Sequence, residues 1–405
     1  MIEEFKETGR NEPAGSLRSR PKTSVIEETE SRRIEPFLAK RRPPTPCLVI
    51  DLEIVCAQYE KLRVHFPGAE IFYAIKANPA PEIISSLAEL GASFDVASEG
   101  ERHRCRDLGI PGKRQSFGNT IKRENDIACA HAEGVTLFAF DSIGELDKLA
   151  RHAPGAKVYC RILAEGKGAE WPLSHKFGCT PDMAVDLLQK ARTLGLRPAG
   201  VSFHVGSQQT EPLRWRPAIE NAAKVFQAGA HAGLDLELLN VGGGLPAQYR
   251  LPIPPLADYA TAIDDALRQY FGGARPRIIV EPGRYLVGDA GVVCSTVLLI
   301  ARKSHHAHRR WVYVDAGFYN GLPETRDERI HYRLRTPQRS GGCERVILAG
   351  PTCDSIDVIY QRAEYDLPLD LEIGDRLDFL SAGAYTASCS AVEFNGFPPV
   401  PTHCI

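Results

Sequence analysis

The chain has 405 residues, which is long enough for a large barrel with an appended domain or for two domains. Its 49 lysines and arginines nearly balance its 51 aspartates and glutamates, so it lacks the basic excess typical of nucleic-acid-binding proteins. No stretch is apolar for long enough to cross a bilayer. We therefore expect neither a nucleic acid nor a membrane as a partner.

The 11 cysteines are scattered along the chain and form no C-x-x-C pair. This pattern favours free thiols in a reducing cytoplasm over disulfides or structural zinc. Three histidines, His305, His306 and His308, lie close together, but no acid or cysteine completes a set of metal ligands there. We predict a cytoplasmic protein without a metal, in which this histidine segment is an exposed hairpin loop.

Residues 1–35 are mostly polar and predict a flexible tail. A short apolar strand near residues 36–50 and an amphipathic helix from about Glu53 to His65 follow. Strands and helices then alternate eight times, which is typical of parallel strands joined by right-handed crossovers. The candidate strands are IFYAIKAN (71–78), SFDVAS (93–98), QSFGNT (115–120), TLFAFDS (136–142), KVYCRILAE (157–165), AGVSFHVGS (199–207), LELLNVGGG (236–244) and RIIVEPGR (277–284).

The segments between these strands have apolar residues at helical spacing, and several end in glycine, a common helix stop. Eight repeats favour a (β/α)8 barrel over residues 36–289, since open doubly wound sheets more often have about five to seven strands. From about residue 290, short β-rich runs are separated by turns. We predict that residues 290–405 form an all-β domain, joined by the strand near residues 36–50.

In such a barrel, the active site lies at the carboxyl ends of the strands. Each polar residue there has an ordinary explanation when taken alone. A lysine often ends a strand in water, a lone histidine is usually a satisfied core or surface residue, and three glycines often form a turn. Together, however, they form an unusual collection: Lys76, Asp95, Arg161, His204, Ser207, Gly242, Gly243, Gly244, Glu281 and Arg284.

This collection matches the needs of a phosphorylated aromatic aldehyde. Lys76 can form an imine with the aldehyde, and we expect partial desolvation to lower its pKa. His204 can cover the face of the ring, and Glu281 can keep a ring nitrogen protonated, which makes the ring an electron sink. The glycine run allows close backbone approach to a phosphate, and Arg284 can bind it with two hydrogen bonds.

Longer motifs occur in a fixed order: YAIKAN (73–78), FDVAS (94–98), SHKFG (174–178), SFHVGSQ (202–208), NVGGGLP (240–246), EPGRYLV (281–287), GPTCDSIDVI (350–359) and SAGAYTASCSAVEFNGFPP (381–399). In these motifs the chain resembles the fold-type III pyridoxal-phosphate decarboxylases, the ornithine/lysine/diaminopimelate decarboxylase family. The resemblance covers most of the chain beyond the tail. It implies an alanine racemase-like barrel followed by a β-domain, pyridoxal 5′-phosphate as the cofactor, and a head-to-tail homodimer with two active sites at its interface.

The resemblance also implies a role for individual residues. Lys76 is the Schiff-base lysine, His204 stacks on the pyridine ring, and Glu281 pairs with the ring nitrogen. Cys353 reaches over from the partner subunit and acts as an acid at the α-carbon after CO2 leaves, although the thiol taken alone could equally be an inert core cysteine. Asp354 binds the distal amine of the substrate. The phosphate is held by Ser207, Gly243, Gly244, Arg284 and Tyr385, and the cofactor is flanked by Asp95 and Arg161.

The residue after this cysteine bears on substrate choice. Family members that act on diaminopimelate usually carry glutamate there, and those that act on ornithine or lysine carry aspartate, as this chain does with Asp354. The segment GLPETRDERIHY (321–332) resembles the bacterial ornithine/lysine group. Its acids Glu324 and Asp327, with Tyr385, are further candidates for the substrate site, but a solvated charged loop is an equal alternative, and which acid points inward is open.

The sequence thus predicts decarboxylation of a basic L-amino acid, either ornithine to putrescine or lysine to cadaverine. Cys389 and Glu393 depart from the family pattern, so another diamino acid such as 2,4-diaminobutyrate or diaminopimelate is an alternative. A racemase of this fold would carry arginine at the ring nitrogen, and Glu281 argues against one. A non-catalytic homologue tends to lose cofactor residues, and this chain retains them.

Overall fold

The computed structural model of the protein describes residues 31–172 and 176–405. Residues 1–30 of the predicted tail and part of the SHKFG motif therefore lie outside the described residues. Eight parallel strands close into a barrel, in which each strand pairs with the next barrel strand along the chain until β11 meets β2. This confirms the predicted (β/α)8 barrel. Its strands are β2 (Glu70–Ala74), β3 (Ser93–Val96), β4 (Gln115–Phe117), β5 (Leu137–Phe140), β6 (Lys157–Arg161), β8 (Arg197–Ser202), β10 (Leu238–Asn240) and β11 (Arg277–Val280).

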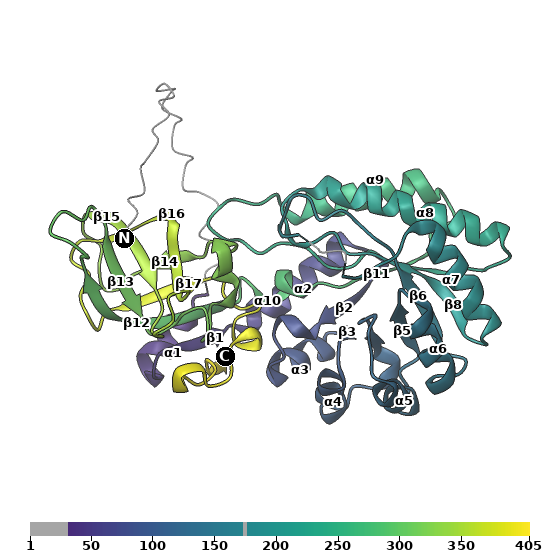
Figure 1. The fold of residues 1–405 in the computed structure, drawn as a ribbon, viewed down its shortest axis with the longest axis horizontal. Helices are drawn as coiled ribbons and strands as arrows, with labels where there is room; N and C mark the ends of the chain where they lie inside the picture. The colour runs from purple at the N-terminus through teal and green to yellow at the C-terminus, as the bar shows by residue number, and fades with distance from the viewer. Residues whose placement is uncertain (1–30, 173–175) are drawn as a thin grey trace, which may run out of the picture.

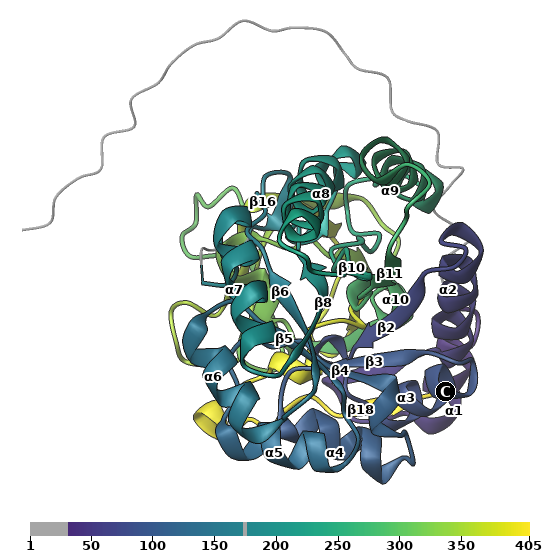
Figure 2. The same cartoon turned by 90° about the vertical axis from the view of Figure 1, so that its right-hand side faces the viewer.

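Helices surround these strands on the outside of the barrel (Figure 2). Their ends follow local signals in the sequence. The carboxylate of Asp51 accepts a hydrogen bond from the Glu53 N–H at 3.0 Å and caps the first of them. Gly134 (φ 88°) and Gly233 (φ 74°) adopt the left-handed conformation soon after two others end. The helices are α2 (Leu52–His65), α3 (Pro81–Glu89), α4 (Glu99–Asp107), α5 (Glu124–Ala132), α6 (Ile143–His152), α7 (Pro181–Thr193), α8 (Trp215–His231), α9 (Leu256–Phe271) and the short α10 (Arg284–Val287).

A mixed eight-stranded sheet forms a second unit beside the barrel (Figure 1). The main path of the sheet runs β14-β17-β12-β13-β15-β16, and β1 pairs antiparallel with β12 and parallel with β18. The strand before the barrel and the last strand of the domain are therefore neighbours. The strands are β1 (Cys47–Ile50), β12 (Gly291–Ala301), β13 (Arg310–Val314), β14 (Arg333–Arg335), β15 (Cys343–Ala349), β16 (Val358–Pro368), β17 (Arg376–Leu380) and β18 (Thr402–Cys404).

The histidine segment behaves as the sequence predicts. It connects β12 to β13, which pair antiparallel, and His305, His306 and His308 are all exposed. Two further short strands, β7 (Ala169–Trp171) and β9 (Ser207–Gln209), pair antiparallel in a small sheet of their own. Within the described residues, we find no helix with the length and apolar character needed to span a membrane.

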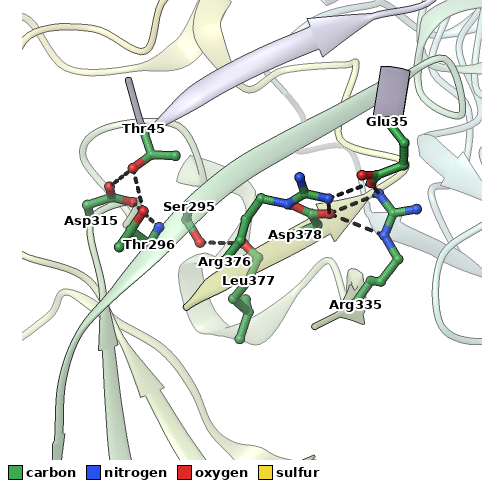
Figure 3. A network of polar contacts seen from close by, with 9 residues as sticks. All are labelled: Glu35, Thr45, Ser295, Thr296, Asp315, Arg335, Arg376, Leu377 and Asp378. Carbon is green, nitrogen blue, oxygen red and sulfur yellow. Dashed lines mark hydrogen bonds and ion pairs between the residues drawn. The ribbon is translucent and has the colours of Figure 1, made fainter. Parts of the chain in front are cut away.

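A helix that the sequence analysis did not predict, α1 (Ile34–Arg41), packs against the β-domain sheet, so the tail boundary expected at residue 35 lies inside it. Figure 3 shows the polar contacts that hold this helix. Glu35 Oε1 accepts hydrogen bonds from Arg335 Nη2, at 2.7 Å, and from Arg376 Nη2. Both arginines also pair with the buried carboxylate of Asp378. The N-terminal helix is thus tied to β14 and β17 through charge.

Candidate active site

Lys76 lies just beyond β2, in a short 3-10 turn (Ile75–Ala77), rather than at the tip of a longer strand as predicted. The chain segment that follows β17 holds this turn in place. The Tyr385 N–H donates to the Ala77 carbonyl oxygen at 2.8 Å, and the Asn78 side chain donates to the Gly383 carbonyl oxygen at 2.9 Å. The β-domain therefore fixes the direction in which Lys76 leaves the barrel.

Two adjoining cavities open at the carboxyl ends of the barrel strands, and Lys76, His204 and Glu281 line both of them. One cavity, of about 210 Å³, is also lined by Asp95, Tyr159, Arg161 and Phe177. The other is also lined by Ser207, Gly243, Gly244, Arg284 and Tyr385. The structure thus brings together all of the predicted cofactor-binding residues. The three shared side chains stand where the two cavities meet.

Glu281 follows β11 directly, and its carboxylate is held by the last residue of the neighbouring strand β10. Asn240 Nδ2 donates to Glu281 Oε1 at 2.5 Å, while Asn240 Oδ1 accepts from the Gly242 N–H at 2.9 Å. Burial and the nearby Asp95 raise the pKa of Glu281 to about 7, although the Asn240 hydrogen bond, Lys76 and other positive charge oppose this. A cation placed beside Glu281 would therefore be bound strongly.

His204 lies two residues beyond β8, outside the strand that the sequence analysis placed it in. Its Nδ1 accepts a hydrogen bond from the Gly206 N–H at 3.0 Å. Burial, followed by the positive charges of Arg161 and Lys76, lowers the pKa of His204 well below 6.5. The imidazole is therefore neutral, and it lines both cavities without adding charge to them.

The side chain of Lys76 reaches water because it projects into the cavity, while protein surrounds that cavity on most sides. Burial by itself lowers the pKa of this lysine, but Tyr385, Asp95 and Glu281 outweigh burial and raise it above 10.5. The sequence analysis expected a lowered pKa, and this expectation was wrong. Desolvation could be inferred from the apolar strand, whereas the acidic groups that oppose it come from three other elements of the fold.

The second cavity has the character of an anion site. Arg284 begins α10 and is buried, and its guanidinium donates to Ser207 Oγ at 3.0 Å. The guanidinium carbon also lies 4.8 Å from the centre of the Tyr385 ring. The N–H groups of Gly243 and Gly244 donate no hydrogen bond within the described part of the chain. Two backbone donors, a hydroxyl and a guanidinium thus border one space.

The glycines are required by the close approach of backbone segments. A Cβ on Gly243 would lie 2.5 Å from the Glu281 carbonyl oxygen, and one on Gly244 (φ 111°) would lie 2.6 Å from the Gly206 carbonyl oxygen. Beside the other cavity, a Cβ on Gly118 would lie 2.0 Å from Asp95 Oδ1. That buried oxygen has no hydrogen-bond partner among the described residues. These observations fit a bound group with a phosphate at one end and polar ring atoms at the other.

The structure distinguishes the two acids of the 321–332 segment. Glu324 is buried and forms a bidentate pair with Arg284, at 2.5 Å from Oε1 to Nη2 and 2.6 Å from Oε2 to Nη1. Asp327 lies on the surface, where 69% of its side chain is exposed. Glu324 therefore points inward, but towards the predicted phosphate-binding arginine rather than towards open space for a substrate.

Cys353 and Asp354 lie on the connection between β15 and β16 and line neither cavity of this chain. The Cys353 side chain is exposed. The Asp354 carboxylate is half-buried and accepts a hydrogen bond from the Tyr319 hydroxyl at 3.0 Å. These two predicted residues are thus presented on the surface of the β-domain instead of inside the barrel mouth.

Sequence reasoning missed three residues that shape the site. Asn240 stands in the quoted motif NVGGGLP, so its position next to the glycines was a usable signal. Tyr249, whose hydroxyl accepts from Arg284 Nη1 at 2.6 Å, had no such signal. Tyr159 lines the larger cavity from within β6 and reads in the sequence as an ordinary buried strand residue.

The closed barrel, the Lys76 amine near the Glu281 carboxylate and the adjoining anion site together define an enzyme of the pyridoxal-phosphate barrel class. A family model described as "Pyridoxal-dependent decarboxylase, pyridoxal binding domain" matches residues 52–288, which is more than half of the chain. A lysine/ornithine decarboxylase from Selenomonas ruminantium is 36% identical over 363 residues, covering 89% of this chain and 90% of the relative.

Two other relatives add to this comparison. A crystal structure of a lysine/ornithine decarboxylase from Vibrio vulnificus, complexed with putrescine, has a TM-score of 0.82 and 31% identity over 94% of this chain and 99% of that one. Antizyme inhibitor 2 from Xenopus laevis is 33% identical over 88% of this chain and 80% of that protein. The chain belongs to the pyridoxal-phosphate-dependent ornithine/lysine decarboxylase family. It is a carboxy-lyase of that family with pyridoxal 5′-phosphate as its cofactor.

Proposed function

We propose that the protein decarboxylates a basic L-amino acid, converting ornithine to putrescine or lysine to cadaverine. The observation that carries the proposal is the junction of the two cavities, where an amine, a neutral imidazole and a carboxylate surround one space beside an anion cradle. When bound, pyridoxal phosphate supplies the electron sink into which the bond to CO2 breaks. The residues of the chain hold that group and direct its reactivity.

Each residue at the junction has one task. Lys76 is the amine that holds the aldehyde carbon of the cofactor, and His204 covers one face of its ring. Glu281 accepts a hydrogen bond from the protonated ring nitrogen, and that positive charge offsets the burial and the nearby Asp95 that raise the Glu281 pKa in the protein alone. Asp95 and Arg161 flank the cofactor. The phosphate is bound by Ser207, Gly243, Gly244, Arg284 and Tyr385.

The distal part of the site needs a second copy of the chain. Cys353 and Asp354 are presented on the surface of the β-domain, so a partner subunit in a homodimer can place them at the barrel mouth of the first. There Asp354 holds the distal ammonium of the substrate, and Cys353 donates a proton to the α-carbon. Asp327, exposed in the single chain, is a further acid for the ammonium. All 11 cysteines are free, which supports a cytoplasmic location.

Racemisation, a non-catalytic role and a different diamino-acid substrate can each be compared with the geometry of the site. Amino-acid racemisation would favour a cationic group at the ring nitrogen, and the carboxylate of Glu281 stands there instead. A non-catalytic role is worth testing because one relative is named an antizyme inhibitor, although this chain keeps the amine, the imidazole and the phosphate ligands. Decarboxylation of a different diamino acid would need only a change in the distal part of the site.

The test is incubation of cofactor-loaded protein with the L and D forms of ornithine, lysine, 2,4-diaminobutyrate and diaminopimelate, with CO2 and amine measured. We expect CO2 and a diamine from L-ornithine or L-lysine. Inversion of configuration without CO2 would support the racemase, and neither product with any substrate would contradict catalysis. Lys76→Ala should abolish turnover, and Lys113→Ala, at an exposed lysine, is the matched control.

The shared site has its own test. Lys76→Ala protein and Cys353→Ala protein are prepared separately, dissociated and mixed. After random reassociation, about half of all dimers contain one chain of each variant. Each mixed dimer has one intact site and one site that lacks both residues, so activity should recover to about a quarter of the wild-type value. No recovery above the sum of the two variants would contradict a site shared between subunits.

A further inference from the structure

A tight turn in the C-terminal segment, η7 (Phe394–Gly396), contacts two loops: the connection between β15 and β16, which carries Cys353 and Asp354, and the loop after β13, which carries Tyr319. Asn395 at its centre is exposed and adopts the left-handed conformation, with φ of 52°. The Ala391 N–H, just before the turn, donates to the Tyr319 carbonyl oxygen at 2.8 Å and ties the segment to the loop after β13. The turn is therefore anchored to the β-domain at more than one point.

The first contact is between Asn395 and Cys353. Asn395 Oδ1 accepts a hydrogen bond from the Cys353 N–H at 3.2 Å and a second from Cys353 Sγ at 3.4 Å. One amide oxygen thus holds both the backbone and the thiol of the same residue. The left-handed backbone of Asn395 directs this amide towards its neighbour, and asparagine tolerates that conformation better than most residues.

The second contact passes through two aromatic rings. Phe394 stacks on Tyr319, with ring centres 4.0 Å apart and ring planes 21° apart. The Tyr319 hydroxyl donates to Asp354 Oδ2 at 3.0 Å. Movement of Phe394 would therefore release the ring that supports the Asp354 carboxylate.

We propose that the turn 394–396 is a positioning element for the distal site, in which Asn395 holds the Cys353 thiol and Phe394, through Tyr319, holds the Asp354 carboxylate. This inference rests on the proposed function for the roles of Cys353 and Asp354. The two contacts divide the task, since the first governs the proton donor and the second governs the group that binds the distal ammonium. A single turn thereby fixes the positions of both the Cys353 thiol and the Asp354 carboxylate.

The first test measures how fast iodoacetamide alkylates Cys353 in the native, cofactor-loaded protein, with mass spectrometry of the modified peptide. Asn395→Ala removes the acceptor that holds the thiol proton, and we expect alkylation to be faster by about fivefold, the factor for one net hydrogen bond. Asn395→Asp places a carboxylate there, which disfavours the thiolate, and should make alkylation slower than in the wild type. Cys343, exposed and bonded to the Gly341 carbonyl oxygen, is the internal control.

The second test separates the two contacts by kinetics. Asn395→Ala should lower kcat and leave KM for the diamino acid within about twofold, and combining it with Cys353→Ala should cause no loss beyond Cys353→Ala alone. Phe394→Leu should instead raise KM more than it lowers kcat. Equal alkylation in the wild type, Asn395→Ala and Asn395→Asp would overturn the positioning role, as would additive losses in the double variant.

These outcomes are distinguishable from a failure of the proposed function. The alkylation series does not depend on turnover. If the protein decarboxylates no diamino acid but the series keeps its order, the proposed reaction is wrong and the contact between Asn395 and Cys353 stands. If decarboxylation occurs but Cys353 is alkylated at the same rate in the wild type and both Asn395 variants, the proposed reaction is supported and the positioning role is wrong.

Discussion

The carboxylate of Glu281 should destabilise the cofactor-free fold at neutral pH, and its removal should reveal this. Burial and Asp95 raise its pKa from 4.5 to about 7. Between these two pH values the unfolded chain releases the proton while the folded chain keeps it, so stability falls as pH rises from 4.5 through 7. Since a tenfold change in a proton equilibrium corresponds to about 1.4 kcal/mol, the loss is at most about 3.5 kcal/mol.

Glu281→Gln removes the ionisable group and keeps an oxygen that can accept the Asn240 hydrogen bond. We expect the variant to be more stable than the wild type by about 1–3 kcal/mol at pH 8, with the difference shrinking towards zero near pH 5. The assay is urea unfolding of both cofactor-free proteins from pH 5 to 8, followed by circular dichroism at one protein concentration. Asp107→Asn, at an exposed acid, should show no such trend. A difference that is the same at pH 5 and pH 8 would refute the reasoning.

Four further variants test other parts of the site and fold. Gly118→Ala should push the Asp95 carboxylate out of place, because the new Cβ would stand 2.0 Å from it, and we expect the cofactor to be lost on dialysis while circular dichroism is unchanged. Glu324→Gln should weaken cofactor binding by about tenfold in a titration without raising KM for the diamino acid; the reverse pattern would mean that this acid binds substrate. In urea unfolding, Asp378→Ala should cost about 3 kcal/mol or more, because it removes the fully buried carboxylate that pairs with both arginines, whereas Glu35→Ala should cost about 1 kcal/mol or less; equal losses would contradict the difference in burial of the two acids.

The eight barrel strands could be predicted because parallel strands buried on both faces are continuous apolar runs. Their ends could not be predicted with the same success. The turn that carries Lys76 departs from the expected strand because the backbone at Gly383 and Tyr385 binds it, and Gly383 is 305 positions along the chain from its partner Asn78. Contacts at such separation leave no local pattern in the sequence.

The helix α1 escaped prediction for a similar reason. Ile34 and Leu38 pack against the β-domain sheet, and Glu35 pairs with arginines on β14 and β17. Isolated helices of this length are marginal in water, so the tertiary contacts decide whether the segment is helical. A charged segment near the start of a chain is therefore predicted to be a flexible tail unless the residues that it contacts in the fold are known.

The residues that line the two cavities could be predicted from the sequence because most of them lie near the end of a barrel strand or stand in a motif of fixed order. The electrostatics of the site could not. The pKa of Lys76 rises because Tyr385, Asp95 and Glu281, from three separate elements, surround it. The inward direction of Glu324 likewise depends on Arg284, which belongs to the other structural unit.

The pairing of β1 with β12 and β18 has a consequence for how the chain is made. Ile50 in β1 and its partner Cys404 in β18 are separated by the whole barrel and most of the β-domain. During synthesis at roughly 5–20 residues per second, this first strand waits tens of seconds before both its neighbours leave the ribosome. Its four residues, all buried in the finished sheet, are exposed and able to pair wrongly throughout that interval. Expression should therefore be more sensitive to chaperone supply and to growth temperature than the stability of the finished protein would indicate.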